Sequence, residues 1–453
     1  MFTGLRTQLN FGDVLVNELM NKNHKLFILR DIIDWKKINK IYKGCYKSNK
    51  GNKTKETDLV IGLFILKHLF KKSYHVIINE LHENFAYMYF CGVSSDIIKD
   101  LNKEDKKIIS HSTLVKIKKK LGVKKFKKIE RSFYNDLKKA GLVDGRKLIS
   151  DTTSVESNII YPTEINLLRR VIEEASAVIQ GVRYKKYLAE TEILRKSKQI
   201  SKVYYSAKKR TKKLLENCTS QLLKFSGEVL IKAQEKVKNN SLNLKKYVID
   251  RYEKLINIGA KIVKQIEVKY AGKEVKDKIV SYFEDYARSL PKGKIGRTCE
   301  FGMKLRIDMS ANNYITNYKS YPGNPSDVTM LKDAVNEHSY QFKETFKEGL
   351  MDAGFYDSVL KKELEDNLNI KLIIPHKKSK KLSKREQKRY NKRAAIESKI
   401  SEGKRNNGLG KTLYKQQSGS EVWTIMSIFV LNIKQFLRSV LKNPKLLHKF
   451  DRV

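Results

Sequence analysis

The sequence has few of the residues that build cross-linked, zinc-bound or membrane-spanning proteins. Only four of its 453 residues are cysteine, and no two of them form a CxxC pair. We therefore expect neither a zinc knuckle nor a disulfide framework, which suits a reducing compartment. The best apolar run, at 422–433, has about half the length of a membrane span and is followed by a lysine, so it predicts a core helix. An intracellular protein without a membrane partner is expected.

Acidic residues are also scarce relative to basic ones. The chain has 49 Asp and Glu against 94 Lys and Arg, a formal net charge of +45 that is spread over the whole length. A hydrophobic content of 40% argues against a disordered polycation. A folded protein with this charge favours nucleic acid or another polyanion, because each neutralised phosphate releases a condensed counterion. General lysine enrichment is the alternative reading of the charge.

Proline is rare, and its six positions mark the organisation of the chain. None precedes Pro162 and none lies between Pro162 and Pro291. These intervals carry apolar residues at helical spacing, so 1–145 and 164–294 predict helical blocks. Within the first block, SHSTLVKIKKKLG (110–122) predicts a short helix that Ser112 caps and that ends at Gly122. That helix suits either a DNA-recognition element or a solvated lysine-rich face.

The remaining segments show the alternation of a sheet. Strands are predicted at RKLISD (146–151), FGMKLRIDMS (301–310), YITNYKSYP (314–322), EGLMD (348–352) and IKLIIPH (370–376), with a helix after each of the last three. The helical block 164–294 separates the first strand from the second. Without that block the order is βββαβαβα. The sequence thus predicts an α/β fold with a mixed five-stranded sheet and helices on both faces.

Three acids occupy positions that an active site would use. Asp151 and Asp352 end predicted strands, at the edge where open α/β sheets bind ligands, and Glu397 lies on a helix that can return there. Clustered carboxylates repel each other unless a cation neutralises them. Oxygen ligands select Mg²⁺ or Mn²⁺, and two such ions can clamp a phosphodiester. Any one acid at a strand end is more often a surface or capping residue. Glu156, five residues past Asp151, either supports the metal site or has a loop or capping role, and the pattern favours the second.

The helix around Glu397 carries a regular set of polar residues. Tyr390, Arg393, Glu397 and Lys404 fall within an arc of roughly 60° at about 100° per residue, so they share one helix face. The two cations can hold phosphates on either side of a scissile bond, and the tyrosine can hydrogen-bond or stack. A surface salt-bridge ladder is the alternative, although this face offers few acids besides Glu386.

These motifs carry a resemblance to a known family. The spacing on the helix resembles the Tyr-Arg-Glu-Lys signature of bacterial insertion-sequence DDE transposases, which have an RNase H-like catalytic core. SDTTSVESNIIYPTEINLL, MDAGFYDS and RAAIESKISEGKRNNGLG are similar to the segments around the first, second and third catalytic acids of that family. The resemblance is close over 145–160 and 295–435, and it extends weakly to the N-terminal block.

The resemblance implies a role for each of these residues. Asp151, Asp352 and Glu397 would be the catalytic acids that bind Mg²⁺ or Mn²⁺, two ions in all, and Tyr390, Arg393 and Lys404 would handle DNA. The implied protein is a DNA transposase that binds terminal inverted repeats, cuts DNA and transfers strands to target DNA. It would work as a homodimer on DNA, in the bacterial cytoplasm near the nucleoid. An RNase H-like nuclease or resolvase, or a catalytically inactive DNA-binding relative, are the alternatives.

The resemblance also gives a domain division. It implies a helical DNA-binding domain, an RNase H-like catalytic domain, a helical insertion and a basic tail, at 1–145, at 146–163 with 295–440, at 164–294 and at 441–453. In better-known members the large insertion follows the fifth strand, whereas here it lies between the first and second strands. Its mixed charge favours a contact with a partner or with DNA over a catalytic role.

Overall fold

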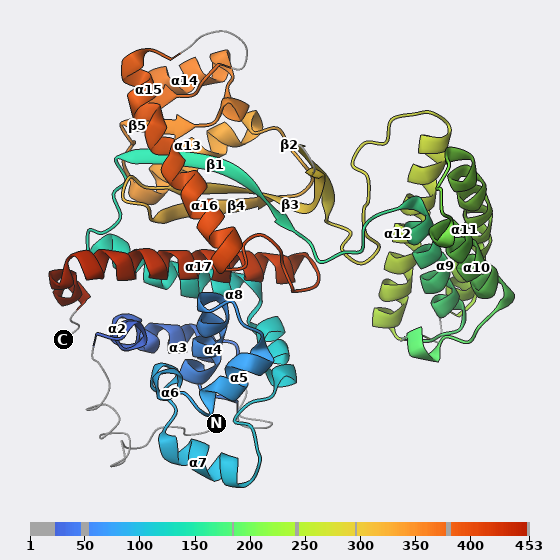
Figure 1. Ribbon diagram of the computed structural model, residues 1–453, viewed down its shortest axis with the longest axis horizontal. Helices are drawn as coiled ribbons and strands as arrows, with labels where there is room; N and C mark the ends of the chain where they lie inside the picture. Colours follow the sequence, from blue (N-terminus) through green and yellow to red (C-terminus); the bar gives the residue numbers. More distant parts are fainter. Residues whose placement is uncertain are drawn as a thin grey trace. The chain divides into compact units, whose positions relative to one another are not determined.

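The computed structural model describes residues 23–46, 54–183, 185–240, 244–294, 297–376 and 382–450. Internal contacts divide the chain into two compact units. The first comprises Met1–Glu156, Lys304–Tyr321 and Pro325–Val453, and the second comprises Ser157–Met303 and Pro322–Asn324. The described parts contain sixteen α-helices and one mixed six-stranded sheet, so the fold is mixed α/β as predicted (Figure 1).

The sheet has one strand more than the sequence predicted. Its strands are β1 (Lys147–Glu156), β2 (Arg288–Lys294), β3 (Arg297–Met309), β4 (Ile315–Tyr321), β5 (Glu348–Met351) and β6 (Lys371–Ile373). The order is β2-β3-β1-β5-β6, and β4 also pairs with β3. The prediction of five strands was wrong because β2 carries Pro291 and little apolar alternation. An edge strand tolerates a proline, since one row of its amides has no ladder partner.

Alternate residues of the central strands face two different cores. Ile149, Leu350 and Ile373 belong to a large core with the N-terminal helices and with α16 (Ala394–Asn406) and α17 (Gln417–Lys442). Leu148, Met351 and Leu372 belong to a smaller core with α13 (Val328–Phe342) and α14 (Ser358–Leu368). The pleat of a strand places successive side chains on opposite faces. Helices therefore cover both faces of the sheet, as predicted.

The N-terminal helices share the large core with α17. They are α2 (Lys25–Ile32), α3 (Trp35–Lys43), α4 (Thr57–Leu69), α5 (Tyr74–Leu81), α6 (Phe85–Cys91), α7 (Ser95–Lys103) and α8 (His111–Lys139). The side chain that caps α8 is that of Ser110, two residues before the predicted cap Ser112. At Gly122, where φ is 62°, a kink breaks the helix, in agreement with the predicted helix end at this glycine. A second helical stretch follows the kink directly, and its apolar residues Phe126 and Ile129 are buried in the core.

The apolar run at 422–433 lies within α17, as a core helix. Among the described residues, α17 is the one helix long and apolar enough to pass a test for a membrane span, and 67% of its most apolar window is buried inside the structure. It packs against α8, α4 and α16. Burial against protein on these sides explains its hydrophobicity without a bilayer.

The second unit is built around a helical bundle with its own core. Its helices are α9 (Glu164–Ile179), α10 (Glu192–Ser206), α11 (Lys212–Asn240) and α12 (Lys246–Tyr270). Helix α9 packs against the other three, and the apolar stripes of all four meet in one cluster of buried side chains. The helical block that the sequence predicted at 164–294 is therefore present, with β2 at its C-terminal end. The division into functional domains stays a prediction.

Candidate active site

Strand register brings the first two predicted acids to the same level of the sheet. β1 and β5 are parallel, with Lys147 opposite Glu348 and Ser150 opposite Met351. Asp151 follows Ser150 on β1 and Asp352 follows Met351 at the end of β5, so each acid lies one residue beyond the last paired residues. Asp352 directly follows β5, as predicted, whereas β1 continues past Asp151 to Glu156. The two carboxylates thus come from neighbouring strands although 200 residues separate them in the chain.

The pleat also gives both carboxylates the same face. Asp151 lies two residues after Ile149, and Asp352 lies two residues after Leu350, so each shares the face of a residue in the large core. This is the face that α16 covers, and Figure 1 shows α16 crossing β1. The helix that carries the third predicted acid therefore lies over the strand that carries the first.

Arg393 connects the first and third acids directly. Its Nη1 donates to Asp151 Oδ2 at 2.9 Å, and its Nη2 donates to Glu397 Oε1. The Arg393 side chain is 12% exposed and that of Asp151 14%, while Glu397 is 56% exposed. One guanidinium therefore bridges a carboxylate in the sheet and a carboxylate at the surface of α16.

Burial and charge shift the ionisation of this group. Burial raises the pKa of Asp151 to about 6; the Arg393 charge and the Thr152 amide oppose the rise, and the Asp352 and Glu397 charges add to it. Burial lowers the pKa of Arg393, but the charges of Asp151, Tyr390, Asp352 and Glu397 together bring it above its ordinary value. The same acids therefore act on both groups, which places Asp352 within electrostatic reach of Asp151 and Arg393.

Of the other two residues of the predicted face, Tyr390 lies beside Arg393 and Lys404 lies beside β1. The Tyr390 ring lies 5.5 Å from the Arg393 guanidinium, and Lys404 Nζ lies 3.4 Å from Ser154 Oγ on β1. The predicted single helix is divided: α15 (Lys384–Tyr390) is joined to α16 by a 3-10 turn at Asn391–Arg393. The backbone stays in the right-handed region through that turn, so the four residues still face one side.

Two segments of the chain match models of known protein families. Residues 14–120 match a model described as "Transposase domain (DUF772)", and residues 284–433 match one described as "Transposase DDE domain". The chain belongs to the insertion-sequence DDE transposases. Neither the search of curated proteins nor the search of solved structures returned a significant match. The second match contains Asp352 and Glu397, whereas Asp151 lies between the two matches.

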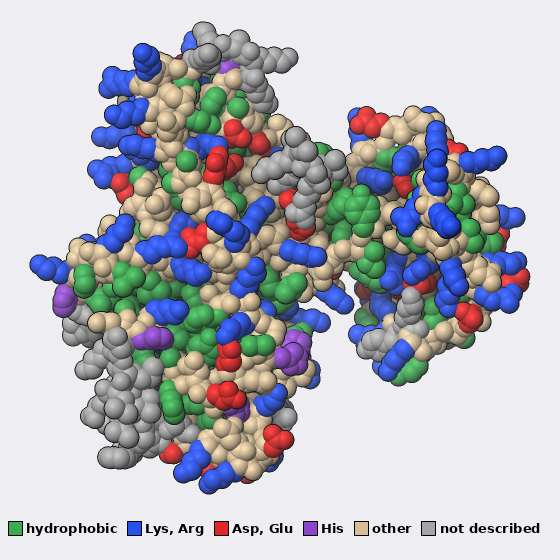
Figure 2. Space-filling model, viewed as in Figure 1, with side chains coloured by type: hydrophobic (Ala, Val, Ile, Leu, Met, Phe, Trp, Pro, Cys, Tyr) green, Lys and Arg blue, Asp and Glu red, His purple; other side chains and the backbone are tan. Residues whose placement is uncertain are grey.

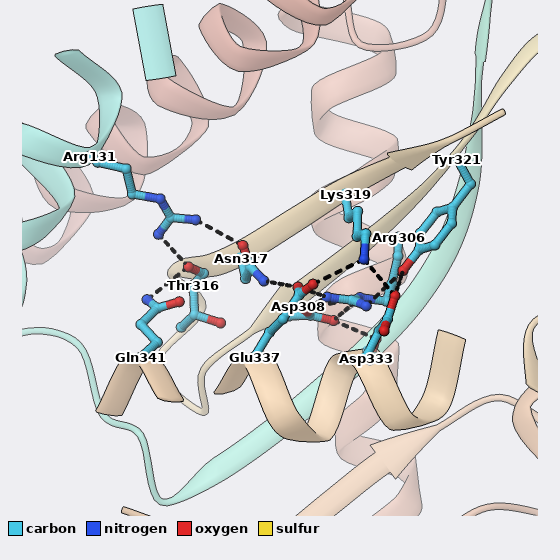
Figure 3. A network of polar contacts seen from close by, with 11 residues as sticks. Arg131, Arg306, Asp308, Thr316, Asn317, Lys319, Tyr321, Asp333, Glu337 and Gln341 are labelled. Carbon is cyan, nitrogen blue, oxygen red and sulfur yellow. Dashed lines mark hydrogen bonds and ion pairs between the residues drawn. The ribbon is translucent and has the colours of Figure 1, made fainter. Parts of the chain in front are cut away.

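A buried polar network supports the strand of the transposase that carries Asp151. Ser150 Oγ donates to Asp308 Oδ1 at 2.6 Å, on the sheet face opposite Asp151. Asp308 and Arg306, both on β3 and both fully buried, form an ion pair at 2.9 Å. Arg306 also contacts Glu337 of α13 at 2.5 Å, and Figure 3 shows this network between β3 and α13. The network fixes the residue that precedes Asp151.

The sequence reading missed this network. Arg306 and Asp308 alternate with the buried apolar residues Leu305, Ile307 and Met309 along β3. Two opposite charges at positions i and i+2 of one strand share a face, so the pattern itself could have indicated a buried pair. It was passed over because the apolar face defined the strand.

The carboxylates of the transposase fit a divalent cation in their chemistry. Three oxygen donors that repel one another, one of them with a raised pKa, would be stabilised by a hard cation. Among the described residues, however, no three His, Cys, Asp or Glu side chains lie close enough together to hold a metal ion. Arg393 bonds to one oxygen of Asp151 and to one oxygen of Glu397, and the other Asp151 oxygen accepts from the Thr152 amide. The donor types therefore suit a divalent cation, while the Arg393 guanidinium stands in for a cation between Asp151 and Glu397.

Proposed function

We propose that the transposase binds the terminal inverted repeats of its element, cuts DNA phosphodiesters and joins the 3′-hydroxyl ends to target DNA. The observation that carries this proposal is the shared register and face of Asp151 and Asp352 under the helix of Glu397. An RNase H-like catalytic core is the arrangement that the mixed sheet, with helices on both faces, supports best.

In this proposal Asp151, Asp352 and Glu397 hold divalent ions, Mg²⁺ or Mn²⁺, with two ions in the working site. When bound, such ions activate an attacking water or hydroxyl and stabilise the leaving oxygen. The protein supplies the positions of the ligands. Asp151 and Asp352 are fixed by the β1–β5 ladder and by the network beneath Ser150, and Glu397 is fixed by α16.

The basic residues of the same face are proposed to hold the DNA. The guanidinium of Arg393 has the planar fork that matches two phosphate oxygens, and Lys404 adds a mobile point charge near Ser154. Tyr390 offers a ring and a hydroxyl beside them. Figure 2 shows Lys and Arg side chains over much of the visible surface of both units, which is the charge that a long DNA contact requires.

We also propose a homodimer on DNA, because two ends of one element must be brought together. The cytoplasm near the nucleoid is the proposed location.

In the second unit, the connection between α10 and α11 is exposed and strongly basic. Its cations are Lys208, Lys209 and Arg210, and Lys212 and Lys213 follow in the first turn of α11. Phosphate contact is the role that we propose for this segment.

A joining assay tests the proposed reaction. Labelled DNA ends with the inverted repeats that flank the coding region are incubated with a target plasmid, Mg²⁺ and the protein. We expect labelled ends joined to plasmid. Asp352→Asn should lower both cutting and joining by about a hundredfold or more, since groups that act as a unit fail together. Asp366→Asn, an exposed acid on α14, is the matched control and should leave both unchanged.

Three results would contradict the proposal. Cutting without joined product would indicate a nuclease or a resolvase. DNA binding without any metal-dependent cutting would indicate an inactive DNA-binding relative. Unchanged cutting by Asp352→Asn would show that the acids have been assigned wrongly.

A further inference from the structure

Arg393 bonds to one carboxylate oxygen of each of two acids in the proposed metal site. Its two terminal nitrogens bond to Asp151 Oδ2 and to Glu397 Oε1. Asp352 adds a third negative charge that acts on both Arg393 and Asp151. In the described part of the site, Arg393 is thus the cation that bridges two of the three acids.

Arg393 can leave the acids by movement but not by losing its charge. A guanidinium does not deprotonate in proteins, and the acids around Arg393 raise its pKa further. Its departure therefore needs another anion of suitable shape. A phosphodiester fits, since the fork of an arginine binds two phosphate oxygens as well as it binds carboxylate oxygens.

The surroundings of Arg393 allow such an exchange of partners. Arg393 lies at the end of the 3-10 turn between α15 and α16, and Glu397 is on the exposed surface of α16. Tyr390 and Lys404, the other proposed DNA contacts, are on the same side of this helical segment. A DNA backbone held by these residues would pass close to the guanidinium.

We propose that Arg393 couples DNA binding to metal binding. Without DNA, Arg393 neutralises Asp151 and Glu397 and opposes the entry of a divalent ion. A DNA phosphate draws the guanidinium away and frees both carboxylates as ligands. This inference rests on the proposed function, because it takes Asp151, Asp352 and Glu397 as the metal ligands.

The coupling has two consequences. Metal and DNA bind with positive linkage, and by thermodynamic reciprocity each raises the affinity for the other by the same factor. Until DNA binds, Arg393 therefore keeps Asp151 and Glu397 from acting as metal ligands. The cost of the restraint is weak metal binding by the free protein.

The test is the affinity for Mn²⁺, measured by isothermal titration on the whole chain, without DNA and with a short duplex that carries the terminal repeat. Titration of the duplex alone gives the Mn²⁺ that DNA itself binds, and a gel confirms that the duplex is intact. Arg393→Gln should bind Mn²⁺ about tenfold more tightly than the natural protein without DNA, within the usual range of coupling. DNA should tighten Mn²⁺ binding by a similar factor in the natural protein and by little in Arg393→Gln.

Two control variants make the result specific. Arg385→Gln removes the same charge from an exposed position on α15, so it should leave the Mn²⁺ affinity unchanged. Arg393→Lys keeps the charge but loses the fork, so it should give an intermediate affinity. If Arg393→Gln does not fold, Arg393→Lys carries the test.

The possible failures can be told apart. Equal Mn²⁺ affinity in Arg393→Gln and the natural protein would overturn the coupling, provided that Asp352→Asn weakens binding. An equal gain in Arg385→Gln would also overturn it, because net charge alone would then explain the effect. If Asp352→Asn leaves Mn²⁺ binding unchanged, the metal site itself is wrong and the proposed function fails with it.

Discussion

Two consecutive residues of β1 have opposite surroundings. Ser150 donates to the buried Asp308, while Asp151 accepts from Arg393 on the other face of the sheet. The alternation of a strand permits this separation. The hydrogen bond of Ser150 holds the backbone of β1 in place, and the Asp151 carboxylate on the other face stays available to bind a cation. These two neighbouring residues of β1 thus link the buried network of the core to the candidate site.

His68 gives a prediction on the pH dependence of stability. Burial lowers its pKa to about 3, the Lys67 charge adds to the effect, and the contact with the Asn407 carbonyl opposes it. The unfolded imidazole has an ordinary pKa of about 6.5, so the unfolded chain binds a proton that the folded protein excludes. The stability from the neutral imidazole is therefore complete above pH 6.5 and is lost as the pH falls toward 3.

Between pH 7 and pH 5, His68 alone should lower the free energy of unfolding by about 2 kcal/mol. His68→Gln removes the titration and keeps a polar side chain beside Ser427 and Asn407. Urea denaturation at both pH values, for both proteins, measures the effect. The variant should lose less stability than the natural protein on acidification. Equal losses would show that the buried imidazole does not resist protonation.

At the scale of elements, apolar periodicity predicted the well-buried helices and the central strands. The helix α17 and strands β3, β4 and β5 were predicted close to their observed positions. The edge strand β2 was missed because it has few buried apolar residues and contains Pro291. At α8 the break at Gly122 was predicted, but not the second helical stretch that follows it directly and packs in the core. Local patterns therefore fail where neighbouring elements determine the structure.

The turn between α16 and α17 offers a prediction with a matched control. Gly408 has φ of +80°, and a Cβ there would lie 2.8 Å from the Trp423 ring. Gly408→Ala should destabilise the protein by about 1–3 kcal/mol, from overpacking and from the left-handed backbone. Gly410 has no positive φ, and its added Cβ would be 3.5 Å from the nearest atom. Gly410→Ala should change stability by less than about 0.5 kcal/mol.

Thermal or urea unfolding of the two variants decides the point. A large loss in Gly408→Ala alone would confirm that the close approach to Trp423 fixes this turn. Similar effects in both variants would contradict it. The turn matters for the candidate site because it connects α16, the helix that carries Glu397, to α17.

At the scale of the whole molecule, the sequence predicted the candidate acids better than their arrangement. Asp151 and Asp352 were selected because each follows a short apolar run, and each lies one residue beyond the last paired residues of β1 and β5. The bridge from Arg393 to Asp151 and Glu397 was not predicted. The spacing of residues on a helix shows which of them share a face. It does not show which residue of a neighbouring strand that face contacts.

Of the three proposed catalytic acids, Asp151 is the most informative one to test. The family matches cover 14–120 and 284–433, and Asp151 lies outside both of them. Its assignment therefore depends on the sheet and on the resemblance of its flanking residues. Glu156 is the competing acid on the same strand, and its backbone pairs with Lys411 in an isolated bridge.

Metal-dependent cutting of repeat-bearing DNA by Asp151→Asn and Glu156→Gln tests the central claim most directly. Asp151→Asn should fold like the natural protein and cut at least about a hundredfold more slowly. Glu156→Gln should cut at nearly the natural rate. The account would be contradicted if Asp151→Asn cut normally, above all if Glu156→Gln had lost the activity instead.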